Sequence, residues 1–120
     1  MPDIAEQFFN CSDRERAIFE AGIKLGTIYH QYVGAPVSLS NLQSLEEAIR
    51  QSVLVQPFVD EASVRINPDN INRHKGTYKY ITLTGDMLDV SLSIRYKGSK
   101  VKARLRYIHE MDYPLMYLED

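Results

Sequence analysis

The spacing of apolar residues changes from a helical period to a strand period partway along the chain. Residues 13–34 and 42–53 carry apolar side chains three and four positions apart, as the buried face of a helix does. The segments LDVSLSIRY, residues 88–96, and VKARLRYIH, residues 101–109, instead alternate apolar and polar side chains, which indicates antiparallel strands with one covered face. The change predicts an α+β fold, with two helices packed on one face of a mainly antiparallel sheet of about three to five strands.

The ends of the first helix are marked by local signals. Ser12 followed by Glu15 has the spacing of a capping box, so a helix is expected to begin near Asp13. It is expected to run until Gly34, because glycine favours a helix end and Pro36 prevents the helix from resuming.

The rest of the chain divides by the same kind of signal. Ser40 with Gln43 has the spacing of a second capping box, which predicts the start of the second helix. Residues 62–67 and 77–85 are expected to be strands, and the polar, basic residues 69–76 are expected to be a loop between them.

Size and composition narrow the class of protein. The chain has 120 residues, which suits a single domain, residues 1–120, and its net charge of −2 gives no general attraction to nucleic acid or anionic membrane. No apolar run reaches the length of a transmembrane helix, and the N-terminus does not resemble a signal peptide. Cys11 is the single cysteine, which fits a reducing, cytoplasmic setting, and with the three histidines it shows no metal-ligand spacing.

Two glycines stand inside the first predicted helix. Gly22, Gly26 and His30 are four residues apart, so they form one ridge of the helix with a trough that ends at the histidine. Each glycine costs about 0.5–1 kcal/mol relative to alanine, so a partner helix, a strand or a flat ligand is expected to approach the backbone there. The main buried stripe beside the ridge is expected to contain Ile18, Leu25, Tyr29 and Val33.

Ordinary structural roles also fit these residues. The two glycines fit close packing, and His30 fits a helix C-terminus, where the helix dipole favours a cation. Glu20 with Lys24 has the spacing of a surface ion pair. Tyr78 and Tyr80 fit packing on one face of a strand.

The segment ERAIFEAGIKLGTIYHQYVGAPVS, residues 15–38, resembles the first helix of the archaeal-type dihydroneopterin aldolases. The resemblance continues through LVQPFV, TYKYITLTG and YPLMY. It implies a homotetrameric lyase of pterin biosynthesis, leading to methanopterin or folate-type pterins. Such an enzyme cleaves 7,8-dihydroneopterin into 6-hydroxymethyl-7,8-dihydropterin and glycolaldehyde.

The resemblance also assigns roles to particular residues. Glu20 is implied to anchor the pterin, and His30 and Gln56 are implied to be catalytic. The catalytic tyrosine of the family falls on Tyr78 or Tyr80, with Tyr78 favoured. No cofactor and no metal are expected, because the N5=C6 imine of the substrate is itself an electron sink. His30 is expected to act as a base, either directly or through a water that it holds with Gln56.

Glu20 and His30 point about 80° apart on an ideal helix, so a site formed between subunits is expected to bring them to one ligand. Two other classes of function remain open. One is a non-catalytic pterin- or purine-binding regulator that keeps Glu20. The other is an oligomerisation module in which the glycines only pack helices.

Overall fold

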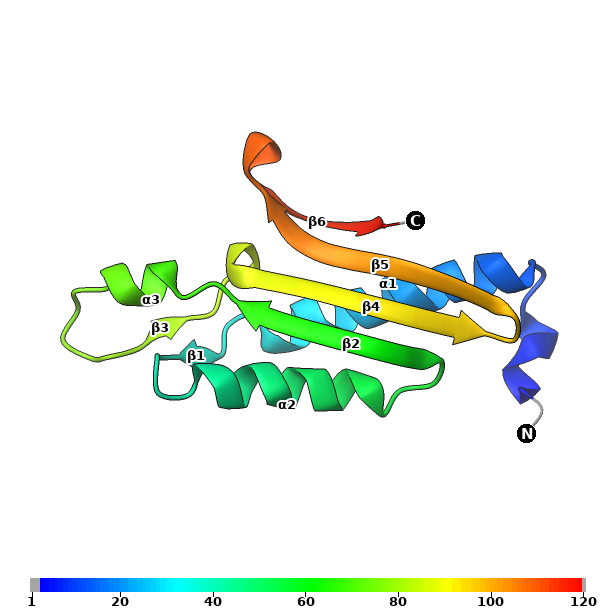
Figure 1. The fold of residues 1–120 in the computed structure, drawn as a ribbon, viewed down its shortest axis with the longest axis horizontal. Helices are drawn as coiled ribbons and strands as arrows, with labels where there is room; N and C mark the ends of the chain where they lie inside the picture. The colour runs from blue at the N-terminus through cyan, green and yellow to red at the C-terminus, as the bar shows by residue number, and fades with distance from the viewer. Residues whose placement is uncertain (1–2, 120) are drawn as a thin grey trace.

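A computed structural model describes residues 3–119 and shows an α+β fold (Figure 1). Three α-helices, six strands and three 3-10 helices follow one another along this part of the chain. In chain order they are η1 (Ile4–Phe8), α1 (Asp13–Tyr32), β1 (Pro36–Val37), α2 (Leu42–Leu54), β2 (Val59–Ile66), α3 (Asp69–Arg73), β3 (Ile81–Thr82), η2 (Gly85–Met87), β4 (Leu88–Tyr96), β5 (Ser99–Ile108), η3 (His109–Met111) and β6 (Tyr113–Leu118).

The main sheet has four strands in the order β2-β4-β5-β6, and all neighbours are antiparallel. Its register places Val90 beside Val64 of β2 and Leu105 of β5, so the alternating apolar residues share one face. The predicted mainly antiparallel sheet is confirmed. Strand β6 was not expected from the sequence, and it adds an edge next to β5 (Figure 1).

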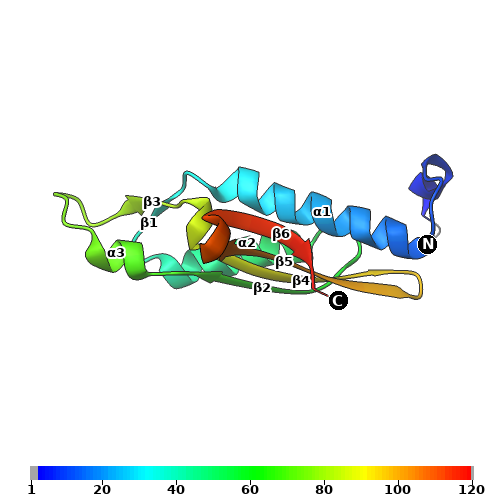
Figure 2. The ribbon, with the colours of Figure 1, turned by 90° about the horizontal axis from the view of Figure 1, so that it is seen from above.

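Both long helices lie on the same face of this sheet, as predicted. Helix α1 runs across β4 and β5, while α2 lies against the edge strand β2 (Figures 1 and 2). The core fills the space between the two layers. Its largest fully buried side chains are Leu25, Ile28, Ile49, Leu83, Leu88, Ile94 and Leu105.

The buried stripe of α1 differs from the predicted one. Ala17, Ala21 and Ile28 join Leu25 in the core, whereas Ile18, Tyr29 and Val33 are only partly buried. The alanines allow the helix to lie close to the sheet. The prediction missed this because it assigned the neighbouring charged positions to a solvent-facing surface.

The helix caps were predicted with mixed success. The capping box of α1 is present, since Glu15 N–H donates to Ser12 Oγ at 3.1 Å and Ser12 N–H donates to Glu15 Oε1 at 2.8 Å. The second capping box is wrong. Asn41 is the N-cap residue of α2, while Ser40 Oγ forms a 2.8 Å hydrogen bond with Ser38 Oγ instead.

The segment between β2 and β4 also differs from the prediction. Residues 69–76, expected to be a loop, contain the short helix α3. Within 77–85 only Ile81–Thr82 forms a strand, which pairs with β1 outside the main sheet. Because β1 has two residues and pairs with Ile81–Thr82, Tyr78 and Tyr80 have no strand to pair with. The segment between α3 and β3 that carries them extends beyond the main sheet (Figure 1).

Candidate functional site

Three charged side chains of α1 form a chain of ion pairs. Arg16 Nε donates to Glu20 Oε2 at 3.0 Å, and Lys24 Nζ donates to Glu20 Oε1 at 2.6 Å. All three residues are buried, with exposed fractions of 3%, 8% and 3% in chain order. The interpretation of Glu20 and Lys24 as a surface ion pair is therefore wrong, because a surface pair would be solvated.

Arg16 is surrounded on its remaining sides. Asp3 Oδ2 accepts from Arg16 Nη1 at 2.9 Å and from the Tyr96 hydroxyl at 3.1 Å. The Arg16 guanidinium carbon lies 3.8 Å from the centroid of the Phe9 ring, with Tyr96 at 4.8 Å and Phe58 at 5.3 Å. We call Asp3, Arg16, Glu20 and Lys24 the Glu20 cluster.

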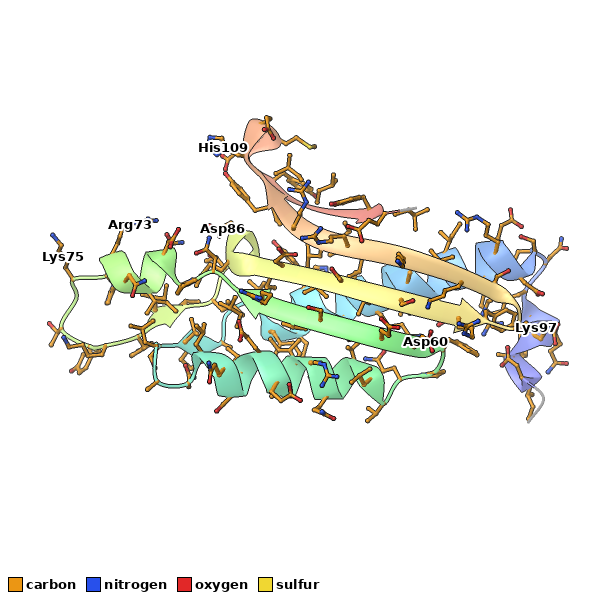
Figure 3. The ribbon with its side chains drawn as sticks, in the orientation of Figure 1. Asp60, Arg73, Lys75, Asp86, Lys97 and His109 are labelled. Atoms are coloured by element: carbon orange, nitrogen blue, oxygen red, sulfur yellow. The ribbon has the colours of Figure 1, made fainter. Side chains whose placement is uncertain are left out.

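The N-terminal segment is held against the β4–β5 turn as well. Lys97, labelled in Figure 3, lies at this turn and forms an ion pair with Glu6 of η1. The rings of Phe9 and Phe19 meet edge to face, with their centroids 5.8 Å apart. The segment that carries Asp3 is therefore fixed at both of its ends.

The environment keeps Glu20 ionised. Burial alone would raise the pKa of this carboxyl, because a buried carboxylate loses water. The hydrogen bonds and charges of Lys24 and Arg16 outweigh burial and hold the pKa of Glu20 below its ordinary value. Each carboxylate oxygen keeps a further lone pair, so Glu20 is a charged acceptor already oriented by its neighbours.

His30 lies in a different environment near the C-terminal end of α1. It lines a cavity of about 310 Å³ with Tyr29 and with residues 113–116 of β6. The His30 ring meets the Tyr29 ring edge to face, with the two centroids 5.2 Å apart. The Tyr29 ring, which forms one wall of this cavity, lies directly over Gly85. A Cβ atom at position 85 would come within 2.5 Å of the ring, so only glycine lets the ring lie this close to the backbone.

Gln56 lies at the opposite edge of the sheet. It follows α2 in the turn that leads into β2, and its backbone N–H donates to the Val53 carbonyl at 3.1 Å. Phe58 in the same turn has a left-handed backbone with φ of 72° and reaches the Glu20 cluster. Gln56 therefore belongs to the β2 edge and His30 to the β6 edge.

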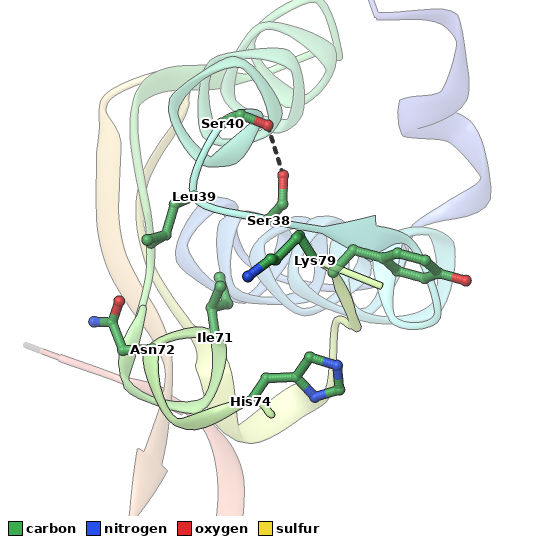
Figure 4. Close-up of a pocket in the computed structure, with 8 residues that line it drawn as sticks. Ser38, Leu39, Ser40, Ile71, Asn72, His74 and Lys79 are labelled. Atoms are coloured by element: carbon green, nitrogen blue, oxygen red, sulfur yellow. Dashed lines mark hydrogen bonds between the residues drawn. The ribbon is translucent and has the colours of Figure 1, made fainter. Parts of the chain in front are cut away.

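The two candidate tyrosines lie in the extension beyond the main sheet. Tyr78 is 72% exposed and Tyr80 is 51% exposed, so neither packs on a sheet as the structural alternative expected. Tyr80 lines a cavity of about 390 Å³ with residues of the β1–α2 link and of α3, and with His74, which follows α3 (Figure 4).

A single chain does not bring the predicted site residues together. Glu20 and His30 are ten residues apart on α1, which separates their backbones by about 15 Å along the helix axis. His30 and Gln56 lie at opposite edges of the sheet, and Tyr78 lies in the extension. Within one chain the predicted site residues are therefore spread along α1, over both edges of the sheet and into the extension.

The two helix glycines face open space within the chain. A Cβ atom built on Gly22 or on Gly26 has no atom from outside its own helix within 4 Å among residues 3–119. Phe19 and Ile23 on the same side of α1 are 57% and 44% exposed. Within residues 3–119, no element makes the close approach that was predicted at these glycines.

Sequence reasoning missed Arg16 as a member of the Glu20 cluster and Phe58 as a ring in contact with it. Arg16 had an available signal, because it stands four residues before Glu20 just as Lys24 stands four residues after it. Phe58 had none, because its contact depends on the turn after α2.

Among residues 3–119, no three His, Cys, Asp or Glu side chains are grouped so that they could hold a metal ion. No helix of the described chain is long and apolar enough to cross a membrane.

Comparison with known proteins gives a consistent result. The family model described as dihydroneopterin aldolase matches residues 12–119. A dihydroneopterin aldolase from Picrophilus torridus is 48% identical over 120 residues, covering 100% of this chain and 98% of that protein. A dihydroneopterin aldolase from Methanopyrus kandleri is 38% identical over 115 residues, covering 94% of this chain and 93% of that protein.

The fold is similar to that of a solved structure. A crystal structure of a protein from Picrophilus torridus superposes with a TM-score of 0.88 and 46% sequence identity. The match covers 98% of this chain and 95% of that chain.

Proposed function

The chain belongs to the dihydroneopterin aldolase family, and we propose that it cleaves 7,8-dihydroneopterin into 6-hydroxymethyl-7,8-dihydropterin and glycolaldehyde. The observation that carries this proposal is the 48% identity to a named aldolase along the whole chain. We further propose that residues 1–120 form one catalytic domain, working in the cytoplasm in the biosynthesis of methanopterin or folate-type pterins.

Glu20 is proposed to bind the pyrimidine ring of the pterin. Its two oxygens can accept parallel hydrogen bonds from the ring N3–H and the 2-amino group, as a carboxylate does with a guanidinium fork. The buried ion pairs with Arg16 and Lys24 support this role, because they keep the carboxylate charged and fixed in orientation.

The reaction breaks the bond between C1′ and C2′ of the substrate side chain. A base removes the 2′-hydroxyl proton, C2′ becomes the aldehyde carbon of glycolaldehyde, and the bonding electrons move into the C6=N5 imine. An acid protonates N5 as the enamine forms, and protonation at C1′ with loss of the N5 proton then restores the imine. The substrate supplies the electron sink, so this route needs neither a Schiff-base lysine nor a metal.

Three residues are proposed to move these protons. His30 and Gln56 hold a water that takes the 2′-hydroxyl proton, or His30 takes it directly. Tyr78 is the proposed acid, with Tyr80 as the alternative. Each such proton transfer typically contributes about 10²–10⁴-fold to the rate.

The active site is proposed to form between copies of the chain in a homotetramer. Within one chain the carboxylate that binds the ring and the histidine that meets the side chain lie about 15 Å apart along α1. The open glycine face of α1, at Gly22 and Gly26, leaves room for another copy to approach that helix.

The test is to incubate purified protein with 7,8-dihydroneopterin and to measure glycolaldehyde and the pterin product. Turnover that persists after exhaustive chelation with EDTA is expected. Loss of turnover in EDTA, with recovery on adding Zn²⁺, would reject the metal-independent route. Tight pterin binding without glycolaldehyde release would reject catalysis in favour of a pterin-binding module.

A further inference from the structure

The two cations that hold Glu20 differ in how many of their donors are used. Arg16 donates to both Glu20 and Asp3, and its guanidinium carbon lies over three aromatic rings. Lys24 Nζ, by contrast, makes one hydrogen bond within residues 3–119, the 2.6 Å bond to Glu20 Oε1. An ammonium group has three donors. Lys24 therefore keeps two donors free beside the carboxylate, in a residue that is only 3% exposed.

The edge of the pyrimidine ring in a pterin presents three groups in order. The 2-amino group and N3–H are donors, and the O4 carbonyl next to N3 is an acceptor. A carboxylate satisfies the two donors and leaves O4 without a partner. Burying a carbonyl without a hydrogen bond is costly, so a site for this edge needs a donor adjacent to the carboxylate.

We propose that Lys24 is that donor and that it is a specificity-determining residue of the pterin site. Its ammonium donates to O4 while Glu20 accepts from N3–H and the 2-amino group. The ligand class is thus a 2-amino-4-oxo pyrimidine ring. This inference rests on the proposed function, since it assumes that Glu20 binds the pterin.

The neighbouring aromatic ring constrains how the ligand arrives. The Glu20 and Lys24 side chains are 10% and 4% exposed, and the centroid of the Phe58 ring lies 5.8 Å from Lys24 Nζ. A ring edge that reaches Lys24 must therefore displace Phe58 or stack against it. Phe58 lies in the turn between α2 and β2 that also carries Gln56, so ligand binding at Lys24 is coupled to that turn.

The experiment is a cycle that combines one change in the protein with one change in the ligand. Dissociation constants are measured by calorimetry for pterin and for 4-thiopterin, which keeps N3–H and the 2-amino group but replaces O4 by sulfur, a weaker acceptor. We expect the wild-type protein to bind 4-thiopterin about tenfold more weakly than pterin, given the strength of a charged hydrogen bond. In Lys24→Met this preference should disappear.

Lys97→Met is the matched control, because Lys97 Nζ also lies over an aromatic ring, that of Tyr96 at 5.5 Å, but pairs with Glu6 outside the cluster. It should keep the wild-type preference for pterin. Wild-type protein that binds both ligands equally overturns the proposal without any variant, even if Lys24→Met does not fold.

The outcomes separate this inference from the proposed function. If a folded Glu20→Gln variant loses pterin binding while Lys24→Met keeps the preference for the oxo ligand, Glu20 retains its role and the role of Lys24 is overturned. If wild-type protein binds no pterin, both the proposed function and this inference are overturned.

Discussion

Replacing Glu20 by glutamine should destabilise the folded protein far more than a surface substitution does. The change removes the carboxylate that faces two buried cations. Arg16 keeps its 2.9 Å ion pair with Asp3, but Lys24 loses the charge of its hydrogen-bond partner within the described chain. Removing one partner of a buried ion pair typically costs 3–5 kcal/mol. Because the glutamine oxygen can still accept one hydrogen bond, we expect about 3 kcal/mol, at the lower end of that range.

Urea unfolding followed by circular dichroism measures this change at a fixed protein concentration. The corresponding fall in Tm is on the order of 10 °C for a chain of this size. Glu47→Gln is the control, since Glu47 pairs with Arg50 at 3.0 Å but the two side chains are 57% and 40% exposed. It should change stability little. Equal and small effects of the two substitutions would refute the reasoning, because they would show that Glu20 is solvated.

Three further outcomes are expected. As pH falls below about 4.3, the ordinary pKa of a glutamate, wild-type protein should lose stability more steeply than Glu20→Gln. The reason is that the pKa of Glu20 is lowered in the folded protein, which contributes stability that is full above this pH and is lost as the pH falls through the folded-state pKa. Urea-unfolding free energies that fall in parallel for the two proteins would contradict this. Gly85→Ala should cost about 1–3 kcal/mol in thermal unfolding, because its Cβ would lie 2.5 Å from the Tyr29 ring; unchanged stability would show that the ring moves freely. His30→Ala and Gln56→Ala should each lower kcat at least about tenfold, and the double variant should lose much less than the product of the two effects; clean multiplication would mean that they serve separate steps.

The arrangement of strands and helices followed from local patterns. Alternation in residues 88–96 and 101–109 identified β4 and β5, and the capping box at Ser12 identified the start of α1. These signals are properties of residues close together in the sequence, so they can be recognised without knowledge of the tertiary structure. The Ser40 signal failed because its hydroxyl has a competing partner in Ser38, which the sequence does not reveal.

The environment of Glu20 could be predicted only in part. Its likeness to the family and its spacing from Lys24 singled it out, but the sequence placed the pair on a solvent-facing side of the helix. Its two cationic partners are contacted by distant segments: Lys24 by Phe58 from the turn after α2, and Arg16 by Asp3 from the N-terminal segment. Contacts between segments distant in sequence leave no periodic signal.

The most direct test of the account is to combine two variants that each lower kcat. His30 and Gln56 lie at opposite edges of the sheet in one chain, so a site that uses both must draw them from different copies. His30→Ala and Gln56→Ala copies are co-expressed with different tags, and mixed assemblies are purified through both tags. We predict that glycolaldehyde release returns to about a quarter of the wild-type rate, because random assortment leaves about that share of sites with both residues intact. Mixed assemblies that stay as inactive as each variant alone would contradict a site shared between copies.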